Sequence, residues 1–399
     1  MNEKECIIAE YSVRGFNDLK KVAEAIAEEQ STGTWVTPLM ETKELKEKFS
    51  SKVLKAKMIK ENLGLIKLAF PSHNIEPNLP MILSMVAGNL FEVDLVHRIK
   101  LENLEFPKEF LKFFKGPRFG ISGCRKFLKI GNRPFLGCII KPDIGLNPKE
   151  HAELAFKAAV GGCDFVKDDE LLGASPKYNP LEERVSRVME ALDRAEEEKG
   201  EKTMYAVNIT DRIDRIVKNA EIARENGANC LMLNFVTAGI SALRMLSESV
   251  KLPIHAHRDM FASFTRIPDH GISVKVLLKL TRMAGGDQIH IGSVDGKLYE
   301  SNSQVVESAN LLRKTWGHLR EALPVSSGGI HALKLKRNFE LLGDDTLFLA
   351  GGGVFSHEMG AEAGARSLRE ALEALSEGMD LKEKAKECRE LKWVLENWC

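Results

Sequence analysis

From residue 134 onward, short apolar segments alternate with longer amphipathic ones, and this alternation restricts the possible folds more than any other feature. The apolar segments number eight: 134–141, 163–170, 204–210, 230–236, 253–259, 288–293, 323–329 and 346–353. Stretches with helical periodicity follow them at 148–161, 181–198, 211–226, 239–249, 271–284, 302–315, 331–342 and 358–376. Parallel strands need crossover helices, and eight strand–helix units can close a sheet on itself. We therefore predict an α/β fold with a (β/α)8 TIM barrel; a doubly wound open sheet is the alternative.

Residues 1–125 lack this alternation and predict a smaller α+β domain. Apolar segments at 6–13 and 63–70 indicate strands, whereas 18–29 and 79–90 have helical spacing. The segment KGPRFGISG, at 115–123, contains a proline and several glycines and predicts a junction. We expect an N-terminal domain over 1–125, a barrel domain over 126–380 and a charged helical tail over 381–399.

The charge balance argues against nucleic acid or an anionic membrane as the main partner. Lys plus Arg and Asp plus Glu both number 57, so the formal net charge is zero. No apolar run reaches the roughly 18 to 20 residues of a membrane span, and the first residues lack a signal-peptide layout. We expect a cytoplasmic protein with reduced cysteines and a small-molecule partner. The few glutamines and many charged residues are typical of proteins from hot environments.

Polar residues end nearly every predicted barrel strand. In a (β/α)8 barrel the active site lies at the carboxyl ends of the strands. The candidates are Lys141, Lys167, Asp169, Glu170, Asn208, His255, His257, Arg258, His290, Ser327–Gly329 and Gly351–Gly353. One such residue alone usually has a structural role, but so many charges at one rim are costly to desolvate without a ligand or metal.

Two kinds of ligand are indicated at this rim. Asp169 and Glu170 are hard oxygen ligands suited to Mg2+, and no His-Glu-x-x-His spacing points to zinc. Glycine pairs after the seventh and eighth strands stand where such barrels often bind phosphate through backbone N–H groups. We therefore predict a phosphorylated substrate and a magnesium ion.

Lys167 does not fit a metal site as an ammonium. Side chains alternate along a strand, so Lys167 and Asp169 should both face the barrel mouth, with Asp168 pointing away into a structural role. A cation there would repel Mg2+. Lys167 either forms a salt bridge with the carboxylates or, with a lowered pKa, reacts with CO2 to give a carbamate that adds an anionic oxygen ligand.

The segment GGCDFVKDDE, at 161–170, resembles the GGxDFxKDDE segment of the large subunit of ribulose-bisphosphate carboxylase/oxygenase (RuBisCO). Further segments resemble motifs of this family in the same order. They are STGTW (31–35), GN (88–89), GCIIKP (137–142), HAHR (255–258), GGDQIHIGS (285–293), GKL (296–298), SSGGIH (326–331) and AGGG (350–353). The resemblance spans almost the whole chain.

The resemblance implies a role for each matching residue. Lys167 would be carbamylated by CO2, complete the Mg2+ site with Asp169 and Glu170, and act as the base that removes a proton next to a ketone. Lys141 would assist proton transfer, and His257 and His290 would orient the substrate. Lys297 would hold an incoming carboxylate, paired with Glu29. Phosphate ligands would be Arg258, Ser327, Gly328, Gly329, Gly351, Gly352, Thr34 and Trp35.

In this family the N-terminal domain of one subunit covers the barrel of its partner. The resemblance therefore implies that Glu29, Thr34, Trp35 and Asn89 act across a dimer interface. The expected active unit is a homodimer or an assembly of dimers.

Several residues near the expected substrate differ from the carboxylases of the family. Asp143 replaces a lysine two residues after Lys141, Ile139 a threonine and Phe261 a histidine, and Leu349 with Ala350 replaces a polar–aromatic pair. The metal set and the phosphate turns stay intact. This pattern resembles a RuBisCO-like protein, an isomerase- or lyase-type enzyme that enolises a phosphorylated, ketose-like substrate.

Two alternatives remain open. Lys297 and Glu29 favour a true ribulose-1,5-bisphosphate carboxylase of divergent archaeal type. The other alternative is a non-catalytic barrel that binds a sugar phosphate. Lys167, Asp169 and Glu170 argue against it, because a site without chemistry has no reason to keep three such groups.

Overall fold

The computed structural model describes residues 3–34, 38–92, 94, 96–174 and 176–398. By compactness the chain divides into two units. Unit 1 is Met1–Lys115 with Met260–Ala284, and unit 2 is Gly116–Asp259 with Gly285–Cys399. This division differs from the expected one, because 116–125 lie in unit 2 and 260–284 in unit 1. As limits of separately folding domains, residues 125 and 380 stay predictions.

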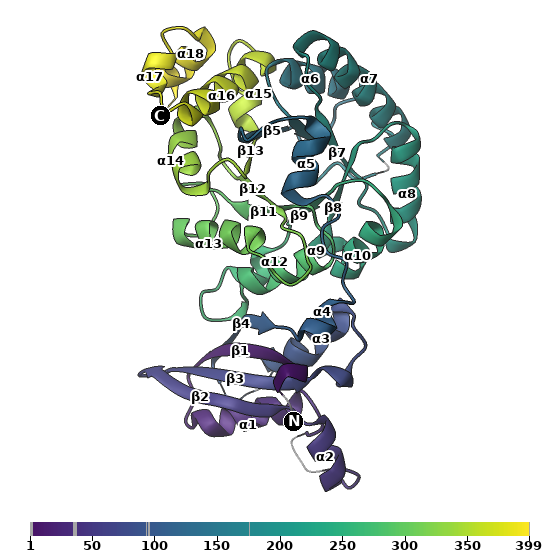
Figure 1. The fold of residues 1–399 in the computed structure, drawn as a ribbon, viewed down its shortest axis with the longest axis vertical. Helices are drawn as coiled ribbons and strands as arrows, with labels where there is room; N and C mark the ends of the chain where they lie inside the picture. Colours follow the sequence, from purple (N-terminus) through teal and green to yellow (C-terminus); the bar gives the residue numbers. More distant parts are fainter. Residues whose placement is uncertain (1–2, 35–37, 93, 95, 175, 399) are drawn as a thin grey trace. The chain divides into compact units, whose positions relative to one another are not determined.

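Unit 2 is built on a closed barrel with the strand order β11-β12-β13-β5-β6-β7-β8-β9, and Figure 1 shows these strands at its centre. Every strand pairs in parallel with its neighbours. The strands are β5 (Phe135–Ile139), β6 (Phe165–Lys167), β7 (Met204–Asn208), β8 (Cys230–Asn234), β9 (Ile254–His257), β11 (Gln288–Gly292), β12 (Leu323–Ser327) and β13 (Leu347–Ala350). Each predicted apolar segment contains one of them. The predicted barrel is confirmed, and the open-sheet alternative is wrong.

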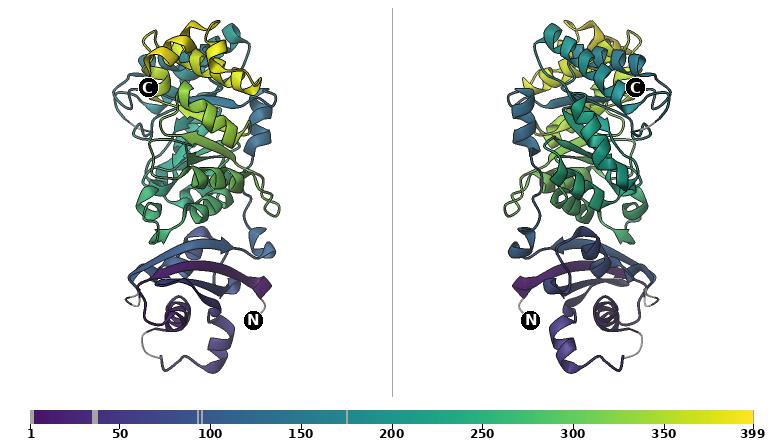
Figure 2. Two further views of the ribbon diagram at one scale, coloured as in Figure 1. Left: turned by 90° about the vertical axis from the view of Figure 1, so that its left-hand side faces the viewer. Right: turned by 90° about the vertical axis from the view of Figure 1, so that its right-hand side faces the viewer.

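Helices cover the outside of the barrel strands (Figures 1 and 2). In unit 2 they are α5 (Gly120–Leu128), α6 (Pro148–Val160), α7 (Leu181–Lys199), α8 (Ile213–Glu225), α9 (Phe235–Ala238), α10 (Ile240–Ser249), α13 (Asn302–Arg313), α14 (Ala332–Leu342), α15 (Gly352–Phe355), α16 (Ala361–Ser376), α17 (Leu381–Lys384) and α18 (Arg389–Asn397). Capping boxes fix two starts: Asn147 with Glu150 for α6, and Ser301 with Gln304 for α13. No helix in the described part of the chain is long and apolar enough to cross a membrane.

The amino ends of the barrel strands are closed by an apolar cluster. The first residues of six strands, Phe135 and Phe165 among them, pack in one core with Ile121, Cys124 and Leu128 of α5. The apolar face of α5 therefore seals this end, and polar chemistry is left to the carboxyl ends. The six described cysteines are buried, and none of them forms a disulfide.

Unit 1 contains a five-stranded sheet with the order β10-β4-β1-β3-β2, antiparallel except for β10 and β4. Its strands are β1 (Cys6–Arg14), β2 (Lys52–Lys60), β3 (Leu63–Pro71), β4 (Arg98–Glu105) and β10 (Gly271–Ile272). Its helices are α1 (Leu19–Glu29), α2 (Lys43–Phe49), α3 (Leu79–Ala87), α4 (Lys108–Leu111), α11 (Ala262–Thr265) and α12 (Val274–Met283), with short 3-10 turns η1 (Glu3–Glu5), η2 (Ser72–Asn74) and η3 (Leu90–Glu92). The predicted α+β character is confirmed.

Helix α12 belongs to unit 1 because its side chains bond to the sheet there. Lys279 Nζ donates to Asn103 Oδ1 at 2.8 Å and to Leu104 O at 2.6 Å, both on β4. Ser273, the N-cap of α12, donates to Glu102 O at 2.8 Å. The sequence pattern predicts a helix here but contains no sign of this attachment.

A buried carboxylate joins three separate segments of the barrel. Asp164, just before β6, accepts from Arg369 Nη2 at 2.6 Å, from Arg133 Nη2 at 2.7 Å and from Leu136 N at 2.9 Å. Its side chain has no exposed surface. Burial alone would raise the pKa of Asp164, but Arg369 and Arg133 outweigh it and lower the pKa.

We expect Asp164→Asn to lower the free energy of unfolding by about 3 kcal/mol at neutral pH, since it leaves the buried Arg369 guanidinium without its anion and removes one of the two anions that pair with Arg133. Denaturant titration measures this. The matched control is Asp345→Asn, whose 51% exposed side chain pairs with Arg125; it should cost less than about 1 kcal/mol. Because the folded-state pKa of Asp164 is lowered, its contribution is present above about pH 4 and is lost as pH falls through the folded value. The wild type should therefore approach the variant in acid, and a gap that persists there would contradict this account.

Candidate active site

Lys167 lies at the carboxyl end of β6, between β5 and β7. Its side chain is fully buried, and within the described residues its Nζ has no hydrogen-bond partner. The nearest acidic oxygen in an ion pair is Glu170 Oε2, at 3.8 Å. Burial lowers the pKa of Lys167, and the attraction of Glu170, Asp169 and Asp168 only partly opposes this. Burial therefore favours the neutral amine, the form that reacts with CO2.

Asp168 faces away from the barrel mouth, as strand alternation predicts. It accepts from Tyr205 Oη at 2.5 Å and from Asn208 N at 2.9 Å, and His151 Nε2 lies 2.9 Å away. Arg184 Nε lies 3.3 Å from its second oxygen. Burial opposes ionisation of Asp168, but Arg184 and His151 lower its pKa. The hydrogen bonds of Asp168 fix the end of β6, and they therefore also fix the direction in which the side chains of Lys167 and Asp169 point.

Lys141 lies between two carboxylates. Its Nζ donates to Asp169 Oδ2 at 2.7 Å and also contacts Asp143 Oδ1. Burial lowers the pKa of Lys141, but the hydrogen bonds to Asp143 and Asp169 outweigh it and raise the pKa. Lys141 is therefore a cation, and its charge is offset on two sides.

The donors around Lys167 fit a hard divalent cation once CO2 is added to the amine. Asp169 and Glu170 supply two carboxylates, and Glu170 Oε2 lies 3.4 Å from His257 Nε2. Among the residues the structure describes, no three His, Cys, Asp or Glu side chains gather as a metal site. A carbamate on Lys167 would add a third anionic ligand from the protein. The buried Lys167 amine, next to both carboxylates, is placed to supply it as a carbamate.

A directed chain of hydrogen bonds crosses the inside of the barrel. Gln288 Nε2 donates to Met204 Sδ at 3.0 Å, so Gln288 Oε1 faces His255 Nδ1, also at 3.0 Å. His255 must then donate through Nδ1 and accept through Nε2, which lies 2.7 Å from His290 Nε2. His290 donates there and accepts at Nδ1 from Ser327 Oγ at 2.8 Å. The tautomers of both imidazoles are thereby fixed.

All three histidines of this region are held neutral. Burial is the main cause: the pKa of His255 falls to about 3, and those of His257 and His290 fall well below the ordinary value. His257 Nδ1 is buried and has no partner among the described residues. Sequence reasoning gives no role to His255 and does not select Gln288. His255 is among the strand-end candidates of the sequence, whereas Gln288 is not; its spacing, two residues before His290, is the signal that could have found Gln288.

The turns after β12 and β13 bring further predicted residues together. Lys297 N and Ser293 Oγ both donate to Gly328 O, at 3.0 and 2.9 Å. Gly328 and Gly329 have φ values of 112° and 92°, which favour glycine. A Cβ at Gly351 would lie 3.1 Å from Lys141 Cε, so this turn and Lys141 lie side by side. Gly352 begins the short helix α15.

Arg258, at the end of β9, forms an ion pair that the sequence does not reveal. Its Nη1 lies 2.6 Å from Glu300 Oε1. The two side chains are only 8% and 2% exposed. No pattern in the sequence selects Glu300, because it comes from the segment before α13 and meets Arg258 only in the folded barrel.

The predicted residues of unit 1 form a smaller group. Asn89 Nδ2 donates to Glu29 Oε1 at 3.1 Å, and Asn89 N donates to Gln30 Oε1 at 3.0 Å. Thr34 is exposed. Trp35 lies outside the described residues. Their predicted role across a dimer interface stays a prediction.

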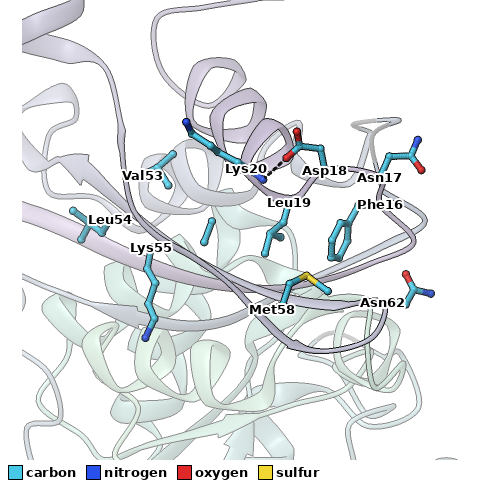
Figure 3. Close-up of a pocket in the computed structure, with 11 residues that line it drawn as sticks. Phe16, Asn17, Asp18, Leu19, Lys20, Val53, Leu54, Lys55, Met58 and Asn62 are labelled. Atoms are coloured by element: carbon cyan, nitrogen blue, oxygen red, sulfur yellow. Dashed lines mark hydrogen bonds between the residues drawn. The ribbon is translucent and has the colours of Figure 1, made fainter.

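A hollow in unit 1 lies between the start of α1 and strand β2 (Figure 3). Phe16, Leu19, Val53 and Met58 are among its lining residues. None of the predicted site residues lines it, and its lining mixes apolar residues with polar ones such as Asp18, Lys20 and Lys55. The hollow therefore has no part in the chemistry described above.

Comparison with known proteins gives matches over the whole chain. The family model of the ribulose bisphosphate carboxylase large chain, catalytic domain, matches residues 120–398, and the N-terminal domain model matches residues 1–110. A ribulose bisphosphate carboxylase of Methanocaldococcus jannaschii is 42% identical, over 97% of this chain and 95% of the relative. A ribulose bisphosphate carboxylase-like protein of Archaeoglobus fulgidus is 40% identical, over 97% and 92%.

Solved structures agree with these matches. The octameric Rubisco of Pyrococcus horikoshii has a TM-score of 0.94 at 38% identity, covering 99% of this chain and 94% of its own. A rubisco-like protein from Burkholderia fungorum has a TM-score of 0.90 at 31% identity, covering 99% and 100%. The similar proteins therefore include both carboxylases and carboxylase-like members.

The histidine chain makes a spectroscopic prediction. In 15N-histidine NMR spectra we expect His255 as the Nδ1–H tautomer and His290 as the Nε2–H tautomer. Both should stay neutral down to about pH 5, well below the ordinary imidazole pKa of about 6.5, since burial disfavours their cations. Gln288→Leu removes the acceptor and should end the tautomer preference of His255. A normal titration of either ring near pH 6.5 would refute this assignment.

Proposed function

This chain belongs to the ribulose bisphosphate carboxylase large-chain family, and we propose that it enolises a phosphorylated, ketose-like substrate by removing a proton next to the carbonyl. The observation that carries the proposal is the buried Lys167 amine, which has no hydrogen-bond partner in the described structure and lies 3.8 Å from Glu170 Oε2 and two residues before Asp169 in the chain. Burial lowers the pKa of this amine and so favours the neutral form that binds CO2. The carbamate that forms would be anionic and would fit its surroundings only beside a cation.

Lys167 as a carbamate, Asp169 and Glu170 would hold Mg2+. When bound, the metal would polarise the substrate carbonyl and stabilise the charge that develops on its oxygen. The Lys167 carbamate would take the proton from the carbon next to the carbonyl. Lys141, a cation beside Asp169, would donate or accept a proton at the substrate oxygens.

The neutral histidines would orient the substrate. His257 Nδ1, buried and without a described partner, is available for a hydrogen bond to a substrate hydroxyl. His290 is held rigidly by His255 and Ser327, so it would present one fixed face to the substrate. Positioning of this kind contributes to catalysis because the reacting groups need no reorganisation.

The phosphate would bind at the turns formed by Ser327, Gly328, Gly329, Gly351 and Gly352 through backbone N–H groups. The resemblance also implies a phosphate contact at Arg258, but in this structure Arg258 is paired with Glu300. Thr34, Trp35, Glu29 and Asn89 would be contributed by the partner subunit of a dimer. Solved relatives described as octameric and as dimeric Rubisco support assembly into dimers or multiples of them.

Carboxylation of ribulose bisphosphate is the second candidate. It is supported by relatives named ribulose bisphosphate carboxylase at up to 42% identity and by the presence of Lys297 and Glu29. Asp143 weighs against it, because it places a carboxylate on Lys141 where the carboxylases have a second lysine. A carboxylated intermediate would add negative charge at this position.

The base is tested by solvent deuterium exchange into ketose phosphates. Preincubation with bicarbonate and Mg2+ should raise the exchange rate, and Lys167→Ala should lower it by about a hundredfold or more. A 13CO2-derived carbamate signal should disappear in the same variant. Lys199→Met is the matched control: this lysine also has a pKa lowered by burial, but its Nζ bonds to Cys163 O at 2.8 Å. Equal exchange with and without CO2 would exclude the carbamate as base.

The two candidate functions are separated by product analysis. With ribulose bisphosphate and labelled CO2, a carboxylase must place the label in 3-phosphoglycerate. We expect proton exchange without label incorporation, because Asp143 offsets the charge of Lys141. Stoichiometric label in 3-phosphoglycerate would establish the second candidate instead of the first.

A further inference from the structure

The ion pair between Arg258 and Glu300 lies at the rim where a substrate would bind. Arg258 follows β9, and Glu300 directly precedes the N-cap of α13. Both side chains are more than nine-tenths buried, and Arg258 Nη1 is 2.6 Å from Glu300 Oε1. The guanidinium is therefore already partnered by an anion of the protein itself.

The backbone next to this pair is shaped to admit it. Gly292, the last residue of β11, has a φ of 86°, a conformation that other residues rarely adopt. A Cβ there would lie 3.2 Å from Arg258 Nη2 and 3.4 Å from Glu300 Oε2. A larger residue would press on both charged groups, so the glycine leaves the space that the pair occupies.

A phosphate that approached Arg258 would meet Glu300 at the same guanidinium. The phosphate and the Glu300 carboxylate would then share the Arg258 guanidinium. Otherwise Glu300 would have to give up its ion pair while its side chain stays buried. Both outcomes are unfavourable in a site of low dielectric. An uncharged hydroxyl creates no such conflict, because it can donate to the carboxylate and accept from the guanidinium.

The turns after β12 and β13 differ from this end of the rim. Lys297 lies against Gly328 through its backbone N–H, and Lys141 Cε lies beside Gly351. Backbone N–H groups and the Lys297 side chain border these turns, whereas the Lys141 ammonium is already paired with Asp143 and Asp169. The turns therefore suit an anion, whereas Arg258, which is paired with Glu300, suits a neutral polar group.

We infer that the substrate carries a single phosphate, bound at the turns of Gly328, Gly329 and Gly351, and that its other end is neutral and hydroxylated and lies at Arg258 and Glu300. The inference rests on the proposed function, since it takes the enolisation site as the place where the substrate binds. It makes Glu300 a specificity-determining residue that disfavours a second phosphate.

Calorimetry with the full chain tests this directly. The probes are ribulose 1-phosphate, ribulose 5-phosphate and ribulose 1,5-bisphosphate, without bicarbonate or Mg2+ so that no turnover occurs. The wild type should bind at least one monophosphate about tenfold tighter than the bisphosphate, and Glu300→Gln should reduce or reverse that ratio about tenfold. Asp295→Asn removes the same charge from the same segment, but its carboxylate bonds to Asn302 at 2.7 Å, so it should leave the ratio unchanged.

Tighter binding of the bisphosphate by the wild type would overturn the inference, and so would an equal shift in Glu300→Gln and Asp295→Asn. The wild-type comparison stands even if Glu300→Gln does not fold. Affinity is measured separately from proton exchange. The experiment can therefore contradict the single-phosphate inference without contradicting the proposed enolisation, and the reverse. Preference for a monophosphate without any exchange would count against enolisation only, and exchange with preferred binding of the bisphosphate would count against the single phosphate only.

Discussion

The burial of one lysine among carboxylates is the constraint on which the rest of the site depends. Lys167 ends a three-residue strand inside a closed barrel, where its amine reaches neither water nor a described hydrogen-bond acceptor. Such a group is costly as an ammonium and reactive as an amine. Asp168 holds the strand end in place through Arg184, Tyr205 and Asn208, and alternation then sets Lys167 and Asp169 toward the mouth. The buried Asp168 therefore fixes the direction in which Asp169, the proposed metal ligand, points.

The barrel decides where such groups can gather. Because α5 and the first residues of the strands seal the amino ends with apolar side chains, the polar ends of the strands converge on the other side. The chain from Gln288 through His255 and His290 to Ser327 lies between these two layers. It holds each ring in one tautomer, so the surface offered to a substrate is rigid.

The sequence predicts the strands, helices and turns that depend on local periodicity. It does not predict contacts between residues that are distant in the chain. Eight apolar segments, alternation at Lys167 to Asp169 and glycine-rich turns are local, and the strands were found from them. Strand β2 was missed because nearly all its side chains are exposed on a sheet edge and lack an apolar period. Glu300 was missed for a different reason: only the folded barrel brings it to Arg258. The hydrogen bonds of Lys279 that join α12 to unit 1 are equally invisible in the pattern.

Two pairs of opposite charges at the rim concern the substrate, not the proton chemistry. Asp143 contacts Lys141, and a buried Glu300 occupies Arg258, so two cations at the rim are each offset by an acid. Neither pair contains Lys167 or Glu170. The only link to the proposed metal ligands is Lys141, which also bonds to Asp169. Under the proposed function, such a site would keep the groups that remove a proton next to a carbonyl, while its attraction for anions would be weaker at two positions. Selection for a less charged substrate would produce this combination, whereas loss of function would not spare the buried lysine and its two carboxylates.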